Sequence, residues 1–160
     1  MNYLGLNAEK VEQTVNELNQ LLSNYHVYYQ NLRNYHWNIN GENFFDLHER
    51  FEHLYNIART NIDEVAERIL TLRHTPVSTL TTYLRRAEVE EASVTHDEHE
   101  MIDTILDNHK ILIKSFRRVM KEADDCGDEG TVDMMGGFLA DIEKESWMLD
   151  AWRSKSVAHA

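Results

Sequence analysis

Long stretches without glycine or proline are the feature that most constrains what this sequence can fold into. The 160 residues include one proline and six glycines, and residues 7–37 contain neither. Because glycine and proline interrupt regular structure most strongly, this scarcity favours a few long helices over many short strands. Hydrophobic residues make up 42% of the chain and charged residues 28%, which is compatible with a packed core. We expect one domain spanning residues 1–160.

Apolar residues recur at intervals of three and four, the period of a helix that is buried on one side. This spacing predicts long helices near residues 7–37, 44–73, 93–124 and from 131 through 152, a short helix at 78–86 and a frayed tail at 154–160. Two short loops would join the long helices into two antiparallel pairs, with a long link between helices two and three. The expected fold class is all-α, a ferritin-like four-helix bundle with a short helix in the long crossover.

The charge balance and the single cysteine narrow the possible functions. Acidic residues outnumber basic ones by 28 to 16, and the formal net charge of -12 excludes a uniformly basic nucleic-acid-binding surface. No apolar run approaches the roughly 20 residues of a membrane helix, and the N-terminus lacks the features of a signal peptide. Cys126 alone excludes an intrachain disulfide and a zinc site built from several cysteines. These features predict a cytoplasmic protein.

The second long helix carries a stripe of candidate metal ligands. With His48 at 0° on a helical wheel, Glu52 lies at about 40°, Asp63 at about 60° and Glu67 at about 100°. The apolar residues of the same helix fall between about -40° and -100°, so the stripe should face sideways, away from the core of its own bundle. The alternative interpretation is a solvated polar face.

The spacing along this helix is too long for one ion but symmetric enough for two subunits. His48 and Asp63 are fifteen residues apart, about 22 Å along a helix, whereas metal–ligand bonds are about 2 Å. The pair His48 and Glu67 has the same midpoint as the pair Glu52 and Asp63. If the helix packs antiparallel against its copy, each histidine meets the partner subunit's Glu67, and two identical sites form.

A second histidine joins this stripe across the Asn40–Gly41 turn. His36 ends the first helix and His48 begins the second, so an antiparallel hairpin places the two imidazoles side by side. Imidazole and carboxylate ligands together suit iron, zinc or manganese. The di-iron site common inside helical bundles uses Glu-x-x-His on two helices, and this chain contains no Glu-x-x-His. An intersubunit site is the arrangement that remains.

Three short motifs follow one another at fixed spacing. They are Tyr35-His36-Trp37-Asn38, His48 with an acid four residues later, and Asp63-Glu64-Val65-Ala66-Glu67-Arg68-Ile69. The combined pattern His-x11-His-x3-acid-x10-Asp-x3-Glu resembles the Dps family, the mini-ferritins named as DNA-binding proteins from starved cells. The resemblance extends to helix order and length over nearly the whole chain.

The resemblance implies a hollow homo-dodecamer that oxidises ferrous iron at di-iron sites, with hydrogen peroxide in preference to oxygen, and stores ferric mineral. Such a ferroxidase protects against oxidative stress. Carried over by position, His36, His48 and Glu52 come from one subunit, and Asp63 and Glu67 come from its two-fold mate.

Two positions at this site have their own interpretations. The family more often has Asp where this chain has Glu52, whose extra methylene lengthens its reach. Trp37 matches a family tryptophan beside the iron site, where it could donate an electron and trap radicals. Packing at the end of the helix is the alternative for Trp37.

An acidic segment, Asp124, Asp128, Glu129 and Asp133, surrounds the start of the fourth helix. Acids stabilise a helix N-terminus and solvate a loop, which would explain them without a function. The resemblance implies that Asp124, Glu129 and Asp133 line three-fold pores. A ring of acids in such a pore would concentrate cations and draw iron inward.

The other histidines are expected to lack a metal role. His96 and His99 resemble a ligand cluster but are expected in a polar first turn. The rest are expected to be surface or satisfied core residues: His26, His53, His74, His109 and His159.

Two further functions compete with a ferroxidase store. A DNA-compacting nucleoid protein would use a basic terminus, but Lys10 is the only basic residue among the first ten, and Arg153 and Lys155 are the only ones among the last eight. A dodecamer would have a net charge of about -144 before metal binding and would repel DNA, which is a polyanion. DNA binding is therefore not expected. The other competitor is a metal-sequestering cage that binds zinc without redox chemistry.

Overall fold

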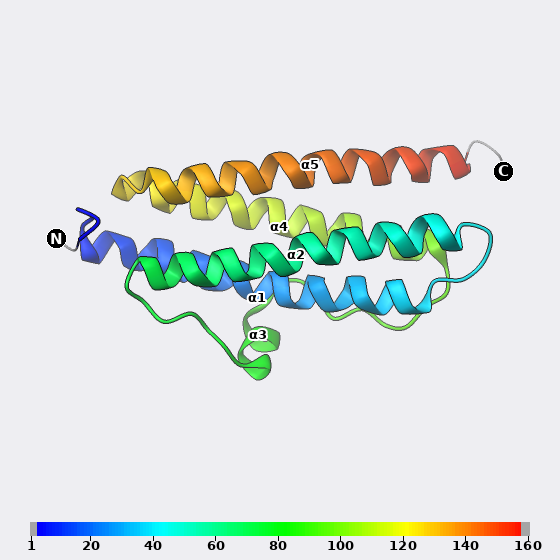
Figure 1. Cartoon of the computed structure of the whole chain (residues 1–160), viewed down its shortest axis with the longest axis horizontal. Coiled ribbons are helices and arrows are strands. Elements are labelled where there is room, and N and C mark those ends of the chain that lie inside the picture. The colour runs from blue at the N-terminus through cyan, green and yellow to red at the C-terminus, as the bar shows by residue number, and fades with distance from the viewer. Residues whose placement is uncertain (1–2, 158–160) are drawn as a thin grey trace.

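The computed structural model describes residues 3–157 of the chain, with side chains for residues 3–154, and its regular elements are all helices. The helices are α1 (Ala8–Asn38), α2 (Phe44–Thr71), α3 (Leu80–Arg86), α4 (Glu98–Cys126) and α5 (Glu129–Val157). The four long helices lie alongside one another, and the short α3 lies outside them (Figure 1). The expected all-α four-helix bundle with a short helix in the crossover is confirmed.

The helices form two hairpins joined by a crossover that runs along the bundle. α1 packs against α2 and α4, and α4 packs against α5. α2 ends at the same end of the bundle as the N-terminus, whereas α4 begins at the opposite end (Figure 1). The crossover therefore travels back along the bundle, and α3, within it, rests on α1.

Apolar side chains from all four long helices meet in one continuous core. Leu32, Phe51, Phe116 and Met135, one from each long helix, are completely buried. Burial of this surface is the dominant favourable contribution to folding. Within the described part of the chain, no helix is long and apolar enough to cross a membrane.

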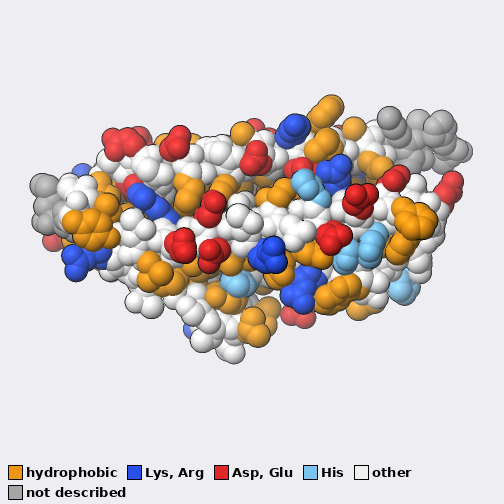
Figure 2. Space-filling model, viewed as in Figure 1, with side chains coloured by type: hydrophobic (Ala, Val, Ile, Leu, Met, Phe, Trp, Pro, Cys, Tyr) orange, Lys and Arg blue, Asp and Glu red, His pale blue; other side chains and the backbone are white. Residues whose placement is uncertain are grey.

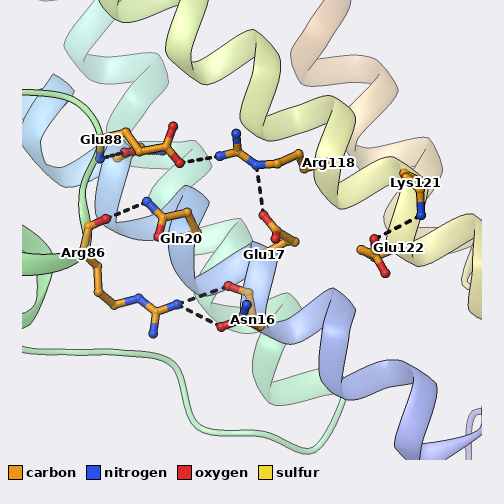
Figure 3. A network of polar contacts seen from close by, with 9 residues as sticks. Asn16, Glu17, Gln20, Arg86, Glu88, Arg118, Lys121 and Glu122 are labelled. Atoms are coloured by element: carbon orange, nitrogen blue, oxygen red, sulfur yellow. Dashed lines mark hydrogen bonds and ion pairs between the residues drawn. The ribbon is translucent and has the colours of Figure 1, made fainter.

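Polar side chains of α1 and α4 hold the crossover against the bundle (Figure 3). Arg118 of α4 donates to Glu17 at 3.1 Å and to Glu88 of the crossover at 2.7 Å. Gln20 of α1 donates to the backbone carbonyl of Arg86 at 2.7 Å, where α3 ends. These contacts give the long link a defined path.

The start of α4 differs from the prediction. The helix was expected from residue 93 but begins at Glu98, with Asp97 as its N-cap accepting hydrogen bonds from the backbone N–H groups of residues 99 and 100. The preceding segment bonds to α1 instead. The side-chain amide of Asn31 accepts from the N–H of Ala92 and donates to the carbonyl of Glu90, both at 2.9 Å. These bonds tie residues 90–92, just before the expected start, to α1, and the helix begins only after Asp97.

The α4–α5 loop and the tail also differ from the prediction. The loop was expected at residues 124–130, but α4 continues to Cys126 and α5 starts at Glu129. Gly127 ends α4 with a φ of 76°, a left-handed conformation that glycine adopts without strain. Residues 154–157 continue α5 as helix, so the expected fraying is wrong there. Residues 158–160 lie outside the described residues.

Candidate metal centre

The hairpin between α1 and α2 brings His36 and His48 together. Gly41 lies in the connection with a φ of 100°. The two imidazoles stack with ring centroids 3.8 Å apart and an interplanar angle of 17°. His36 is buried and His48 is half-buried. The prediction that the hairpin places these rings side by side is confirmed.

Each of the two histidines is oriented by the other's backbone. Nδ1 of His36 lies 2.7 Å from the carbonyl oxygen of His48, and Nδ1 of His48 lies 2.8 Å from the carbonyl oxygen of His36. Because a carbonyl oxygen can only accept, both Nδ1 atoms carry a proton, and the nitrogen that can bind a metal is Nε2 in each ring. Such bonds fix the tautomer and orientation of metal-binding histidines. The pair therefore offers two Nε2 donors suited to a transition metal.

Two aromatic rings that the sequence analysis did not single out enclose the pair. Phe44 stacks on His48 with centroids 4.8 Å apart, and Tyr55 meets His36 edge-on at 5.2 Å. Desolvation raises the pKa of Tyr55, and the negative charge of Glu52 raises it further. Glu52 precedes Tyr55 by three residues, about one turn of α2.

The carboxylates of the stripe face away from the core, as predicted. Glu52, Asp63 and Glu67 are exposed, whereas Phe51 and Val65 of the same helix are completely buried. Asp63 lies about 22 Å from His48 along α2, so the structure does not bring these two together within one chain. Among side chains 3–154, no group of three or more His, Cys, Asp or Glu residues could hold a metal ion.

Trp37 points to a different side of α1 from His36. Its side chain is 60% exposed, whereas that of His36 is buried, as expected for neighbours that are about 100° apart around a helix. The guanidinium of Arg33 lies over the Trp37 ring, with Cζ 4.9 Å from the ring centroid. The role of Trp37 as an electron donor stays a prediction.

Within the acidic segment, Asp128 differs from its neighbours. It is buried and forms an ion pair with Arg68 of α2, whose Nε donates to the Thr131 hydroxyl at 2.8 Å. Thr131 in turn donates to Asp128 through its hydroxyl and its backbone N–H. Asp128 thus ties the start of α5 to α2. The three acids assigned to a pore by resemblance are exposed: Asp124, Glu129 and Asp133.

His109 is a satisfied core residue, as expected. The Tyr28 hydroxyl donates to its Nε2 at 2.9 Å, and its Nδ1–H donates to the Ser146 hydroxyl at 2.7 Å. The Ser146 hydroxyl in turn donates a hydrogen bond to the backbone carbonyl of Ile142 at 2.7 Å. Burial lowers the pKa of His109 to about 3, so the ring is neutral.

The remaining histidines have separate surroundings. On the face shown in Figure 2, histidine side chains gather toward the end of the bundle where α1 joins α2. The Nδ1–H of His96 donates to the carbonyl of Asn38 at 2.7 Å, and the His99 ring lies 5.4 Å from that of Trp152. His26 stacks on Tyr83, and His53 contacts Glu145. His74 donates to the backbone carbonyl of Leu72. His159 lies outside the described residues.

Relatives in sequence cover almost all of the chain. The model of the ferritin-like domain matches residues 15–156. General stress protein 20U of Bacillus subtilis (strain 168) is 39% identical over 141 residues, which is 88% of this chain and 97% of the relative. The DNA protection during starvation protein of Porphyromonas gingivalis is 42% identical over 157 residues, which is 94% of this chain and 95% of the relative.

Solved structures agree with this assignment. The Dps protein of Vibrio cholerae O1, described as a member of a broad superfamily of ferritin-like diiron-carboxylate proteins, superposes with a TM-score of 0.92 at 40% identity, covering 95% of this chain and 96% of that one. The Dps protein of Bacillus brevis superposes with a TM-score of 0.87 at 37% identity, covering 90% and 97%. The chain therefore belongs to the Dps family of ferritin-like proteins.

Proposed function

We propose that this chain is a ferroxidase mini-ferritin. It oxidises Fe(II), preferably with hydrogen peroxide, at intersubunit di-iron sites and stores Fe(III) mineral in a hollow dodecamer, which protects against oxidative stress. The observation that best supports the proposal is the pair of reciprocal hydrogen bonds that leaves Nε2 of His36 and Nε2 of His48 available to a metal. The diiron-carboxylate superfamily of the Vibrio cholerae relative supports iron as the substrate.

The proposed ligand set spans two subunits. One subunit contributes His36, His48 and Glu52, and its two-fold mate contributes Asp63 and Glu67. The exposure of all three carboxylates supports this arrangement, because a partner can reach them without disturbing the core. An isologous contact between two antiparallel copies of α2 repeats every pairing and so forms two equal sites.

The chemistry follows from the ligand types. Carboxylates stabilise Fe(III) more than Fe(II) and so make iron easier to oxidise. Two neighbouring Fe(II) ions give one electron each to a peroxide molecule, and with two protons the products are two Fe(III) and two water molecules. This two-electron step avoids the release of hydroxyl radical. A site with few protein ligands leaves coordination positions free for peroxide and water.

The exposed acids near the start of α5 fit a role in iron entry. Asp124, Glu129 and Asp133 would line a pore at each three-fold axis of the dodecamer. Rings of carboxylates focus the electric field and raise the local concentration of cations. Asp128 has a different part in this proposal, since its ion pair with Arg68 holds the start of α5 in place.

DNA compaction has less support in this chain. Arg153, near the C-terminus, donates to Asp103 at 2.8 Å and also pairs with Asp150. Lys10 lies near the start of α1, with its ammonium 3.5 Å from the Asp125 carbonyl. We therefore propose that protection comes from the removal of iron and peroxide rather than from contact with DNA.

An anaerobic titration tests the proposed function. Fe(II) is added to metal-free protein without oxygen, and peroxide is then supplied while Fe(III) formation and peroxide consumption are recorded. We expect about two Fe(II) oxidised per peroxide, and a particle mass of about 226 kDa for twelve chains of 18.8 kDa. Tight zinc binding without peroxide consumption would favour the non-redox cage, and a stable monomer or dimer would contradict the dodecamer.

A further inference from the structure

We propose that Asn40 is a site of spontaneous covalent modification, where the side-chain amide becomes a carboxylate and part of the protein acquires isoaspartate. The inference goes beyond the proposed function and does not depend on iron. Asn40 lies in the connection between α1 and α2, at the end of the bundle opposite the N-terminus (Figure 1). This connection joins the two helices that carry His36 and His48.

The residue after Asn40 is glycine, and no other asparagine of the sequence is followed by glycine. The reaction begins when the backbone nitrogen of the following residue attacks the side-chain carbonyl of asparagine. A side chain on that following residue hinders the approach, and glycine has none. The sequence therefore permits this reaction at Asn40 more readily than at any other asparagine of the chain.

Both reacting groups are free in the folded protein. The side-chain amide of Asn40 and the backbone N–H of Gly41 form no hydrogen bond with the residues that the structure describes. Both residues are exposed, and a Cβ at Gly41 would meet nothing within 4 Å. Neither group therefore has to leave another contact before the two can meet.

The other asparagines in the described part of the chain lie within helices or are N-caps. Asn38 and Asn43 are the nearest to Asn40 in sequence, and a bulky residue follows each of them. Nδ2 of Asn38 donates to the Asn34 carbonyl at 2.8 Å. Nδ2 of Asn43 donates to the two carboxylate oxygens of Glu98 at 2.9 and 3.0 Å. These two asparagines are internal controls for Asn40.

The reaction needs only water as a co-reactant. The nitrogen of Gly41 bonds to Cγ of Asn40, Nδ2 leaves as ammonia, and a cyclic imide forms. Water then opens the ring at either of its carbonyl groups. One opening gives aspartate, and the other gives isoaspartate, whose backbone runs through the former side chain and is longer by a methylene group. No electrons are transferred, and each modified chain gains a negative charge.

Contacts on both sides of Asn40 confine the change to the loop. Before it, Ile39 is buried and the Nδ1–H of His96 donates to the carbonyl of Asn38 at 2.7 Å. After it, Asn43 is bonded to Glu98. Residues 40–42 between these contacts are exposed, so the added methylene group can bulge into solvent. We therefore expect the histidine pair to keep its geometry.

The test follows metal-free, assembled protein at mildly alkaline pH, where the attacking nitrogen loses its proton more readily. Peptide mass spectrometry reports on Asn38, Asn40 and Asn43 separately, and an isoaspartyl methyltransferase with a labelled methyl donor counts isoaspartate. We expect loss of most Asn40, with Asn38 and Asn43 intact. Asn40→Gln should take up no label, because its longer side chain closes the ring more slowly. Intact Asn40 after a free peptide of residues 38–43 has been converted would overturn the inference.

A second comparison tests the confinement. Fresh and aged wild-type protein should show the same urea midpoint without metal and the same number of rapid Fe(II)-oxidising sites. Asn43→Ala removes the bond to Glu98, so ageing of this variant should lower its urea midpoint. Loss of rapid sites in the aged wild type, in proportion to its isoaspartate, would overturn the confinement. Modified Asn40 in a protein that never oxidises Fe(II), even when fresh, would contradict the proposed function and leave the modification site standing.

Discussion

His36 and His48 hold each other's imidazole through the backbone, with each Nδ1 within 2.8 Å of the other's carbonyl oxygen. One hydrogen bond orients a proposed ligand on α1 and the other orients a proposed ligand on α2. Both Nε2 atoms are therefore positioned by the fold before any metal arrives. Orientation of this kind raises metal affinity, because little conformational freedom is lost on binding.

The substitution His48→Asn should separate the hydrogen-bonding role of His48 from its proposed role as a metal ligand. The amide Nδ2 of His48→Asn can replace the Nδ1–H donor to His36, but the variant has no Nε2. We expect His48→Asn to lose rapid iron oxidation while remaining more stable than His48→Ala. His48→Ala loses the hydrogen bond, so its free energy of unfolding should be about 1–2 kcal/mol lower. Urea unfolding and anaerobic Fe(II) binding check both effects. Wild-type Fe(II) affinity in His48→Asn would count against ligation by His48.

His109 should make the protein less stable in acid. Its pKa is about 3 in the folded state, against about 6.5 in an unfolded chain. Between these values the unfolded state binds a proton that the folded state does not, so stability is lost as the pH falls below about 6.5. The slope reaches about 1.4 kcal/mol per pH unit. Urea unfolding at fixed protein concentration should show a shallower slope in His109→Gln, and equal slopes would contradict this assignment.

Loss of Arg68 should be costly, because its partner is buried. The side chain of Asp128 is 1% exposed, so Arg68→Ala leaves an unpaired buried carboxylate and should cost about 3–5 kcal/mol. Arg117→Ala is the matched control, since Arg117 pairs with Glu143 and both side chains are at least half exposed. The control should change stability by less than about 1 kcal/mol. Equal losses of unfolding free energy in the two variants would show that the buried ion pair with Asp128 stabilises the fold no more than an exposed one.

Duplex DNA should not bind tightly at physiological salt and neutral pH. Each chain carries a net charge of -12, so an assembled cage repels a polyanion. A gel-shift assay with and without a chelator checks this, since divalent cations can bridge acidic surfaces and phosphates. Submicromolar binding that persists in the chelator would refute the prediction.

The fold was predictable because its signals are local. Apolar periodicity gave the four long helices, and the start of α1 agrees closely with its capping residue Asn7. The start of α4 was not predictable in this way. The segment before α4 is tied to α1 by Asn31, which lies about sixty residues away in sequence, and no neighbouring residue signals that contact.

The candidate site shows the same division. His36 and His48 were expected together because a short turn separates their helices. Tyr55 and Phe44 were missed, since periodicity says which side a ring lies on but not which ring it meets. The partner of Asp128 was missed because Arg68 is sixty residues away in sequence.

Each iron site, in the proposed function, is shared between two subunits across a two-fold axis. Two variants divide the site: His36→Ala with His48→Ala removes the imidazoles, and Asp63→Ala with Glu67→Ala removes the partner's carboxylates. Either variant alone should lose rapid peroxide-driven oxidation of Fe(II), because every site lacks half of its ligands.

The most direct measurement is the activity of the two variants dissociated and reassembled together. In a mixed pair, one site combines both damaged halves and the other combines both intact halves. Random pairing makes about half of the pairs mixed, so about a quarter of the wild-type rapid sites should return. If each chain builds its own site, mixing two inactive variants restores nothing. No recovery in cages that mass spectrometry shows to be mixed would contradict the shared site.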